Sequence, residues 1–286
     1  MKTIKLLYLL VCICTSAPLF AQGDMKEQVV VPLSNPGKPG SLEVGLTNGG
    51  IRVTGYDGKE VIVEASLPSR KSDTADERDK VSATNNEKNA KSGAEGMKRI
   101  SGNSFSLEVE ENDNKVEIQT DSWKRRIDLV IRVPKNFALK LSSVNYGVIS
   151  VENVNGDMEI SSVNGGITLT NVSGSASVNT VNGHITATFK EVTRDIPMAF
   201  TTLNGNVDIT FPSNVKANTK IKTDSGDIYT DFDMAIETSK PKVNQKSTSG
   251  TYRVSIEDWV YGKINGGGPE CMFKNMHGDI YIRKAK

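Results

Sequence analysis

Glycine recurs every nine residues in the middle of the chain, and this spacing limits the possible folds more than any other feature. The five glycines of the run are Gly147, Gly156, Gly165, Gly174 and Gly183. The second and fourth residues after each glycine are apolar or small, whereas the first and third are mostly polar. Such alternation is typical of a strand with one buried face. A short fixed period of strand and turn predicts stacked repeats rather than a closed globule.

The predicted fold is an all-β solenoid with two short strands in each coil and roughly 18–20 residues per coil. Looser copies of the repeat begin at further turn glycines, namely Gly205, Gly226, Gly250 and Gly278, and Gly49 begins an isolated early copy. Inserts at 190–197 and 231–246 lengthen two of the connections. The basic tail at 283–286 follows the last predicted strand, and we expect it to guard one open end of the stack.

Further alternating strands precede the run, at 42–46, 105–109, 116–118 and 127–133, with a hairpin turn at Asp113-Asn114. The segment 69–99 is different, because it is dense in Lys, Asp, Glu, Asn and Ser and has almost no large apolar residue. It cannot bury enough surface to offset the entropy lost on ordering. We expect a disordered charged insert within a single domain that covers residues 22–286.

The first 21 residues have the composition of a signal peptide. Lys2 and Lys5 precede a short apolar run at 6–14, and cleavage after Ala21 is expected. The mature protein would be exported to the periplasm, the outer-membrane surface or the extracellular space. No later stretch is long and apolar enough to predict a transmembrane helix. Cleavage would leave Cys271 as the single cysteine, and we expect a small buried hydrophobe there rather than a reactive thiol or an intermolecular disulfide.

The charge balance argues against nucleic acid as a partner. The chain has 35 Lys and Arg against 34 Asp and Glu, so it lacks the positive field that attracts phosphate backbones. The two histidines, His184 and His277, lie beside turn glycines of distant repeats and have no metal-ligand spacing. Gly165-Gly166-Ile167 departs from the calcium-binding nonapeptide Gly-Gly-x-Gly-x-Asp. We expect no metal and no cofactor.

Asparagine precedes the turn glycine in one corner of successive coils. The residues are Asn145, Asn164, Asn182 and Asn204, and Asp224 and Asn265 are the expected continuations. An asparagine side chain can bond its own backbone in a turn, and the following glycine accepts a positive φ. Stacked coil on coil, these residues predict a structural asparagine ladder. The alternative is a row of amides displayed to a ligand.

The outward positions of the predicted strands carry mainly Ser, Thr, Asn, Asp and Tyr. Asp227, Tyr229 and Tyr281 form the candidate ligand face, because aromatic rings beside carboxylates suit a glycan or a protein. Two carboxylate pairs are candidates for catalysis, Asp157 with Glu159 and Asp227 with Asp208 of the preceding coil. Alternating acidic residues also occur on solvated sheet faces without any chemistry, so we predict no catalytic residue.

One family has this combination of motifs. The alternating strand 127–134 ends in proline, the strand 139–143 follows, and Asn145-Tyr146-Gly147 begins the Gly-x-Ile-x-Leu units. In these features the chain resembles the bacterial DUF4097 proteins, which are related to the head GIN domains. The resemblance covers about residues 42–282, and the charged insert departs from it. It implies a secreted or surface-located right-handed β-helix, often labelled an adhesin, with no known active site.

The predicted function is that of an exported, non-enzymatic adhesin or cell-envelope binding scaffold. The partner would be a surface glycan or an envelope protein. Two alternatives stay open. One is a glycan-active β-helix enzyme, a polysaccharide lyase or hydrolase, which would need carboxylates that converge in a groove. The other is an envelope-stress partner protein that binds through the end of the stack or through the charged insert.

Overall fold

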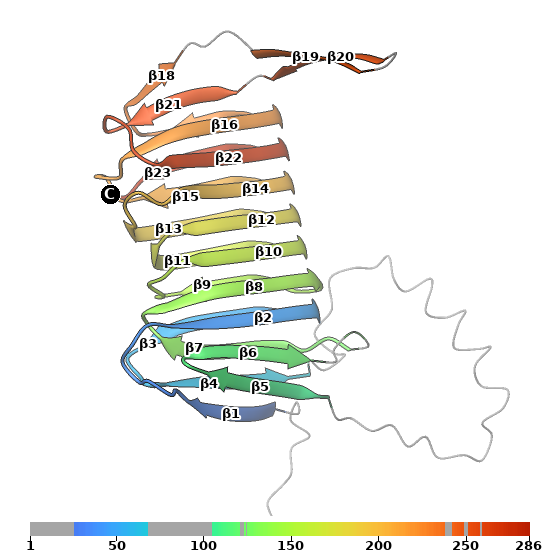
Figure 1. The fold of residues 1–286 in the computed structure, drawn as a ribbon, viewed down its shortest axis with the longest axis vertical. Helices are drawn as coiled ribbons and strands as arrows, with labels where there is room; N and C mark the ends of the chain where they lie inside the picture. Colours follow the sequence, from blue (N-terminus) through green and yellow to red (C-terminus); the bar gives the residue numbers. More distant parts are fainter. Residues whose placement is uncertain are drawn as a thin grey trace, which may run out of the picture.

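The computed structural model describes residues 26–67, 105–120, 123, 125–237, 242–248, 251–257 and 259–286 (Figure 1). Its regular elements are all strands, which confirms the all-β prediction. The predicted signal peptide at 1–21 and the charged insert at 69–99 lie outside the described residues.

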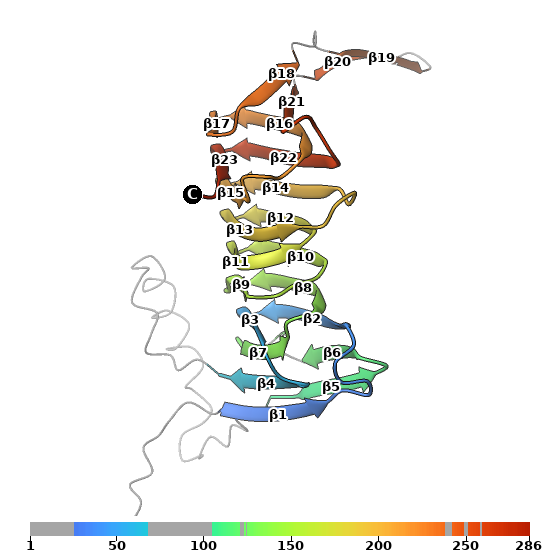
Figure 2. The same cartoon turned by 90° about the vertical axis from the view of Figure 1, so that its left-hand side faces the viewer.

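Two large sheets face one another (Figure 2). The ten-stranded sheet has, in spatial order, β1 (Lys26–Pro32), β4 (Glu60–Ser66), β7 (Asp128–Pro134), β3 (Ile51–Tyr56), β9 (Ile149–Glu152), β11 (Ile167–Gly174), β13 (Ile185–Val192), β15 (Val207–Phe211), β23 (Ile280–Lys284) and β17 (Ile228–Thr230). The eleven-stranded sheet has β18 (Met234–Glu237), β21 (Val260–Ile264), β16 (Ala217–Ser225), β22 (Glu270–His277), β14 (Met198–Asn204), β12 (Ala176–Asn182), β10 (Met158–Asn164), β8 (Phe137–Asn145), β2 (Gly40–Asn48), β6 (Lys115–Thr120) and β5 (Leu107–Asn112). A separate hairpin consists of β19 (Lys242–Thr248) and β20 (Thr251–Glu257).

In the middle of the stack, each coil has one strand in each sheet, and coils pair in parallel. Met158 pairs with Ala176 and Ile167 pairs with Ile185, so the register repeats after 18 residues. The apolar positions predicted from the nine-residue period are buried between the sheets, where they form the core. The next coil is longer, because Ser177 pairs with Ala199, 22 residues further on. The connection between β13 and β14, where the sequence predicts an insert, contains the extra residues.

The coils are not stacked in chain order. The coil formed by β2 and β3 lies between the β6–β7 and β8–β9 coils, and the β22–β23 coil lies between β14–β15 and β16–β17. The expectation that the tail at 283–286 guards one end is therefore wrong, because β23 is an internal strand paired on both sides. The repeat pattern does not encode the order of coils, since each copy offers its neighbours the same apolar register and the same glycines.

Both ends of the stack carry antiparallel strands, so the two large sheets are mixed. β4 pairs antiparallel with β7 and β1 with β4, and β5 forms a hairpin with β6. Its turn residues Asp113 and Asn114 both have positive φ, at 49° and 62°, as a two-residue hairpin turn requires. At the other end, β21 and β18 continue the eleven-stranded sheet in antiparallel pairing.

Phenylalanines fill the core where the coils become longer. The ring of Phe200 stacks on Phe273 with centroids 5.6 Å apart, and Phe189 stacks on Phe211 at 5.4 Å. Cys271 is buried in the same region, in β22, as the sequence predicted. Burial raises the pKa of its thiol, which disfavours the reactive thiolate.

Candidate functional site

A column of glycines runs along one corner of the stack. In spatial order it contains Gly49, Gly147, Gly165, Gly183, Gly205, Gly278 and Gly226. A Cβ built on Gly165 would lie 1.9 Å from the carbonyl oxygen of Gly147, and one on Gly183 would lie 2.3 Å from that of Gly165. The φ angles of these three glycines are not in the left-handed region. The expectation that each glycine supplies a positive φ is therefore wrong for them, and the close approach of the neighbouring coil is what excludes a side chain.

The four predicted asparagines lie in one row beside this column and are joined side chain to side chain. The Nδ2 groups of Asn164, Asn182 and Asn204 donate to Oδ1 of the preceding member at 3.0, 2.9 and 2.8 Å, and Asn145 accepts the first of these bonds. The amides thus bridge neighbouring coils as a ladder, the arrangement expected from stacking, although the Nδ2 groups donate to the next amide rather than to their own backbone. The strand register extends the row to Asn48 beyond Asn145.

The expected continuations of the row at Asp224 and Asn265 are wrong. The register places His277 and then Ser225 after Asn204, because β22 lies between β14 and β16. Asn265 belongs to the turn before β22, where its amide donates to two carbonyl oxygens of the 212–216 loop. Asp224 thus lies one residue out of register with the row, and Asn265 lies before its strand rather than at the end of one.

Apolar side chains form a second row on the outer face of the eleven-stranded sheet, one residue before the asparagine row. They are Val144, Val163, Val181, Leu203 and Met276, each 37–41% exposed. The sequence argument described the outward positions as polar and missed this row. The signal was present, since an apolar residue precedes each ladder asparagine. Sheet outer faces are usually polar, so a continuous apolar row indicates a surface of interest.

The structure brings the candidate ligand face together. The rings of Tyr229 and Tyr281 stack with centroids 5.1 Å apart and planes 11° from parallel. The Tyr229 hydroxyl donates to Asp227 at 3.2 Å, and the Tyr281 hydroxyl donates to Asp279 at 3.0 Å. The negative charge of Asp227 raises the pKa of Tyr229, and the hydrogen bond to Asp279 raises the pKa of Tyr281. Both phenols are thus held in the protonated form.

A bidentate ion pair lies beside the tyrosines. Arg283 donates to the two carboxylate oxygens of Asp208 at 2.7 and 3.0 Å, and its guanidinium lies 4.9 Å from the ring centroid of Tyr281. Sequence reasoning missed Asp279 and Arg283 as members of this group. The signal was local, because Asp279 and Arg283 lie two residues on either side of Tyr281 and so share its strand face, as Asp227 shares that of Tyr229. We call Asp227, Tyr229, Asp279, Tyr281 and Arg283 the tyrosine patch.

Neither carboxylate pair considered for catalysis forms a convergent site. Asp227 and Asp208 lie in coils separated by β23, rather than in successive coils. Asp208 is occupied by Arg283. Asp157 accepts a hydrogen bond from Ser175 at 2.6 Å, and Glu159 is exposed on the outer face of its sheet. Ser175, the first residue after Gly174 and therefore predicted to face outward, is itself buried.

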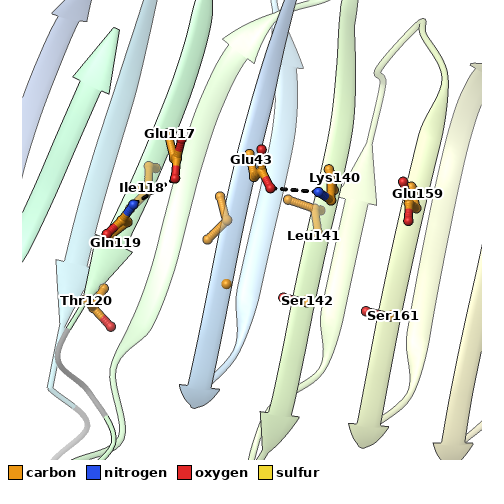
Figure 3. Close-up of a pocket in the computed structure, with 12 residues that line it drawn as sticks. Glu43, Glu117, Ile118, Gln119, Thr120, Lys140, Leu141, Ser142, Glu159 and Ser161 are labelled. Carbon is orange, nitrogen blue, oxygen red and sulfur yellow. Dashed lines mark hydrogen bonds and ion pairs between the residues drawn. The ribbon is translucent and has the colours of Figure 1, made fainter.

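A shallow charged pocket of about 360 Å³ lies on the outer face of the eleven-stranded sheet (Figure 3). Lys140 donates to Glu43 at 2.8 Å, and Lys115 forms an ion pair with the same carboxylate at 3.1 Å. These lysines hold the pKa of Glu43 below its ordinary value. Glu117 and Glu159 complete the charged side, and the rest of the lining is mostly small or polar. The charges are largely paired, which suits a solvated sheet face.

The remaining titratable candidates do not converge. His184 accepts a hydrogen bond from the backbone N–H of Asn206 through Nδ1, at 2.9 Å, and His277 lies in the asparagine row. Among the described residues, no group of three or more His, Cys, Asp or Glu could hold a metal ion. Within the same residues, no helix is long and apolar enough to cross a membrane.

Comparison with known proteins identifies the family. Two solved structures resemble this chain. The first is a "putative cell adhesion protein" from Clostridium sporogenes, with 10% identity and a TM-score of 0.40, and the match covers 92% of this chain and 100% of the other. The second is a "putative adhesin" from Bacteroides fragilis, with 12% identity and a TM-score of 0.40, and the match covers 93% of this chain and 98% of the other. No curated protein matches. A family model described as Toastrack DUF4097 matches residues 19–282, which confirms the resemblance seen in the sequence. The chain belongs to the Toastrack DUF4097 family.

Proposed function

We propose that this protein is an exported, non-enzymatic binding scaffold of the cell envelope that acts as an adhesin, with the tyrosine patch as its glycan-binding surface. The observation that carries the proposal is the position of Tyr229. It lies on β17, the last strand of the ten-stranded sheet, and the residue is 48% exposed. One face of the ring is covered by Tyr281, and the opposite face points away from β23 toward the open edge of the sheet.

The patch has the groups that sugar recognition uses. An aromatic face offers apolar contact to the C–H groups of a sugar ring, and carboxylates and a guanidinium offer acceptors and donors to its hydroxyls. The Tyr229 and Tyr281 rings are preorganised by mutual stacking and by hydrogen bonds to Asp227 and Asp279. Preorganisation reduces the entropy that is lost on binding.

A binding role is favoured over a glycan-active enzyme. A glycosidase uses two carboxyl groups that flank the scissile bond, one of them an acid with a raised pKa. In this chain, Asp208 is neutralised by Arg283, and Asp157 is bonded to Ser175. Lys140 holds the pKa of Glu43 below its ordinary value, and the backbone N–H of Ser34 does the same for the pKa of Glu111, so both carboxyl groups favour the ionised form.

Export and domain organisation form part of the proposal. The charged and apolar segment at 1–21 supports cleavage before Gln22 and transport out of the cytoplasm. The continuous core supports residues 22–286 as one domain, and the parallel middle of the stack supports a β-solenoid with two strands per coil. Amino-terminal sequencing of the protein recovered from the envelope or medium tests export. An intact Met1 in a cytoplasmic fraction would contradict it.

Binding to an array of defined glycans tests the function, with the mature protein, Tyr229→Ala and a control variant. The control is Tyr146→Asn, because Tyr146 is the more exposed tyrosine, at 70%, and Asn tolerates its φ of 61°. We expect one glycan class to bind the wild type and the control and to lose at least about tenfold in affinity with Tyr229→Ala. Equal binding by all three proteins would refute the patch, and turnover of a bound glycan would refute the non-enzymatic role.

A further inference from the structure

Three loops lie side by side at the amino-terminal ends of neighbouring strands in the eleven-stranded sheet, because of the order of these strands. β14, β22 and β16 are adjacent and parallel, so their first residues lie side by side. The loops that lead into them are residues 193–197, 265–269 and 212–216. The second loop comes from the far end of the chain, and it lies between the other two only because β22 is inserted between β14 and β16.

Hydrogen bonds fix two of these loops to one another. The side-chain amide of Asn265 donates to the carbonyl oxygens of Ser213 at 3.0 Å and Val215 at 2.7 Å. Gly268 packs against the backbone of Lys216, where a Cβ would lie 2.4 Å from the carbonyl oxygen. This close approach explains why the glycine-rich turn at 266–268 has no side chain at position 268. The loops are thus held in place before any ligand arrives.

The loops and the end of β13 enclose a cleft of about 840 Å³, a size that suits a small-molecule ligand. Three cationic side chains line it, from Lys190, Arg194 and Lys216. All three are exposed, and none forms an ion pair with a carboxylate of the described residues. Lys190 Nζ donates to Oδ1 of Asn153 at 3.4 Å, which leaves its charge without a carboxylate partner, so the cleft offers three positive charges to an anionic ligand.

The rest of the lining favours a polyhydroxylated anion over a bare one. Glu191 and Asp195 also line the cleft, and their carboxylates can accept hydrogen bonds from hydroxyl groups. Pro212 and Pro269 add apolar surface that suits the C–H face of a sugar, and Gly267 allows close approach to the main chain. A simple inorganic anion has no hydroxyl groups to donate to the two carboxylates, whereas an acidic sugar can direct its hydroxyls to them and its own carboxylates to the cations.

We propose that this cleft is a second binding site, separate from the tyrosine patch, that takes an acidic oligosaccharide whose carboxylates pair with Lys190, Arg194 and Lys216. The site does not depend on the proposed function of the tyrosine patch. Its affinity falls with increasing salt, since exposed ion pairs are screened. Neutral sugars of the same shape lack the charged groups and bind weakly.

Titration calorimetry with tetragalacturonate and its fully methyl-esterified form tests the site. We expect the acid to bind the mature protein and the neutral ester to bind at least about tenfold more weakly, since charge-assisted hydrogen bonds are the strong ones. Equal affinity for the two forms, or no binding of the acid, overturns the proposal. A further arm adds inorganic phosphate as competitor; displacement of the acid at equal concentration would show a simple anion site and would also overturn it.

Variants assign the binding to the cleft. Lys216→Gln and Arg194→Gln should each weaken tetragalacturonate binding about tenfold, whereas Lys274→Gln, an exposed lysine on the sheet face, should leave it unchanged. Tyr229→Ala should also leave it unchanged, which separates this site from the tyrosine patch. Equal losses in the cleft variants and in Lys274→Gln would show a nonspecific charge effect and refute the assignment. Circular dichroism checks that each variant is folded.

Discussion

Replacement of Gly165 by alanine tests the glycine column. The new Cβ would lie 1.9 Å from the carbonyl oxygen of Gly147, whereas ordinary contact begins near 3.4 Å, so the two coils must separate by about 1.5 Å. The hydrogen bond from Ile149 N to Gly166 O, 3.1 Å long, joins the same coils and cannot survive that shift. The Asn164–Asn145 bond beside it is stretched as well.

The expected cost follows from these contacts. Two lost hydrogen bonds contribute about 1 kcal/mol each, and overpacking adds about 1–3 kcal/mol. The stiffer unfolded chain offsets about 0.4–1 kcal/mol of this. We therefore expect Gly165→Ala to lower the free energy of unfolding by about 2–5 kcal/mol, as measured by urea denaturation followed by circular dichroism.

Gly37→Ala is the control, because Gly37 has a φ of +91° and its Cβ would meet no atom within 4 Å. Gly37→Ala should lower the free energy of unfolding only by the backbone strain of a left-handed residue, about 1–2 kcal/mol. If the glycines were required for turn conformation alone, Gly37→Ala would be the more damaging change and Gly165→Ala nearly neutral. That order of stabilities would refute the packing argument.

Three further predictions concern the ladder, the core and the charged pocket. Asn164→Ala should lower the free energy of unfolding by about 1 kcal/mol and Asn204→Ala by about half as much, because Asn164 takes part in two ladder bonds and Asn204 in one; equal losses in urea denaturation would contradict this. Phe200→Ala should cost about 3–5 kcal/mol, since the ring is fully buried, and calorimetry that finds less than 1 kcal/mol would contradict it. Lys140 lowers the pKa of Glu43 in the folded state, so the stabilisation is present above the unfolded pKa and is lost as the pH falls through the folded one. Glu43→Gln should therefore flatten the loss of stability as the pH falls below the ordinary glutamate pKa of 4.5, and an unchanged pH profile would count against the pairing.

The coil geometry could be predicted from local sequence because it depends on short-range periodicity. Alternation at Ile167 and Leu169 determines which side chains face the core, and the 18-residue register between Ile167 and Ile185 is twice the glycine spacing. The hairpin turn at Asp113 and Asn114 was also predictable, since these residue types tolerate positive φ. The backbone conformation of a turn, and the choice of which side chains face the core, depend on residues close together in the chain. Both can therefore be predicted from local sequence.

The candidate sites were only partly predictable. Tyr229 and Tyr281 could be selected as outward aromatics, but their stacking depends on β23 pairing with β17. Asp279 and Arg283 share the strand face of Tyr281 and enter the patch with it. The asparagine row continues from Asn204 to His277 and Ser225 rather than to Asp224, and this continuation depends on the pairing of β22 with β14 and β16.

The sequence by itself determined the all-β class, the buried face of each repeat and the positions where coils turn, because these follow from alternation and from turn residues within a few positions of one another. Only the tertiary structure decided the order in which the coils stack. Parallel pairing joins segments far apart in the chain, and every repeat offers the same apolar and glycine pattern, so local sequence does not distinguish one neighbour from another. The insertion of β22 and β23 between earlier coils therefore created both the tyrosine patch and the cationic cleft.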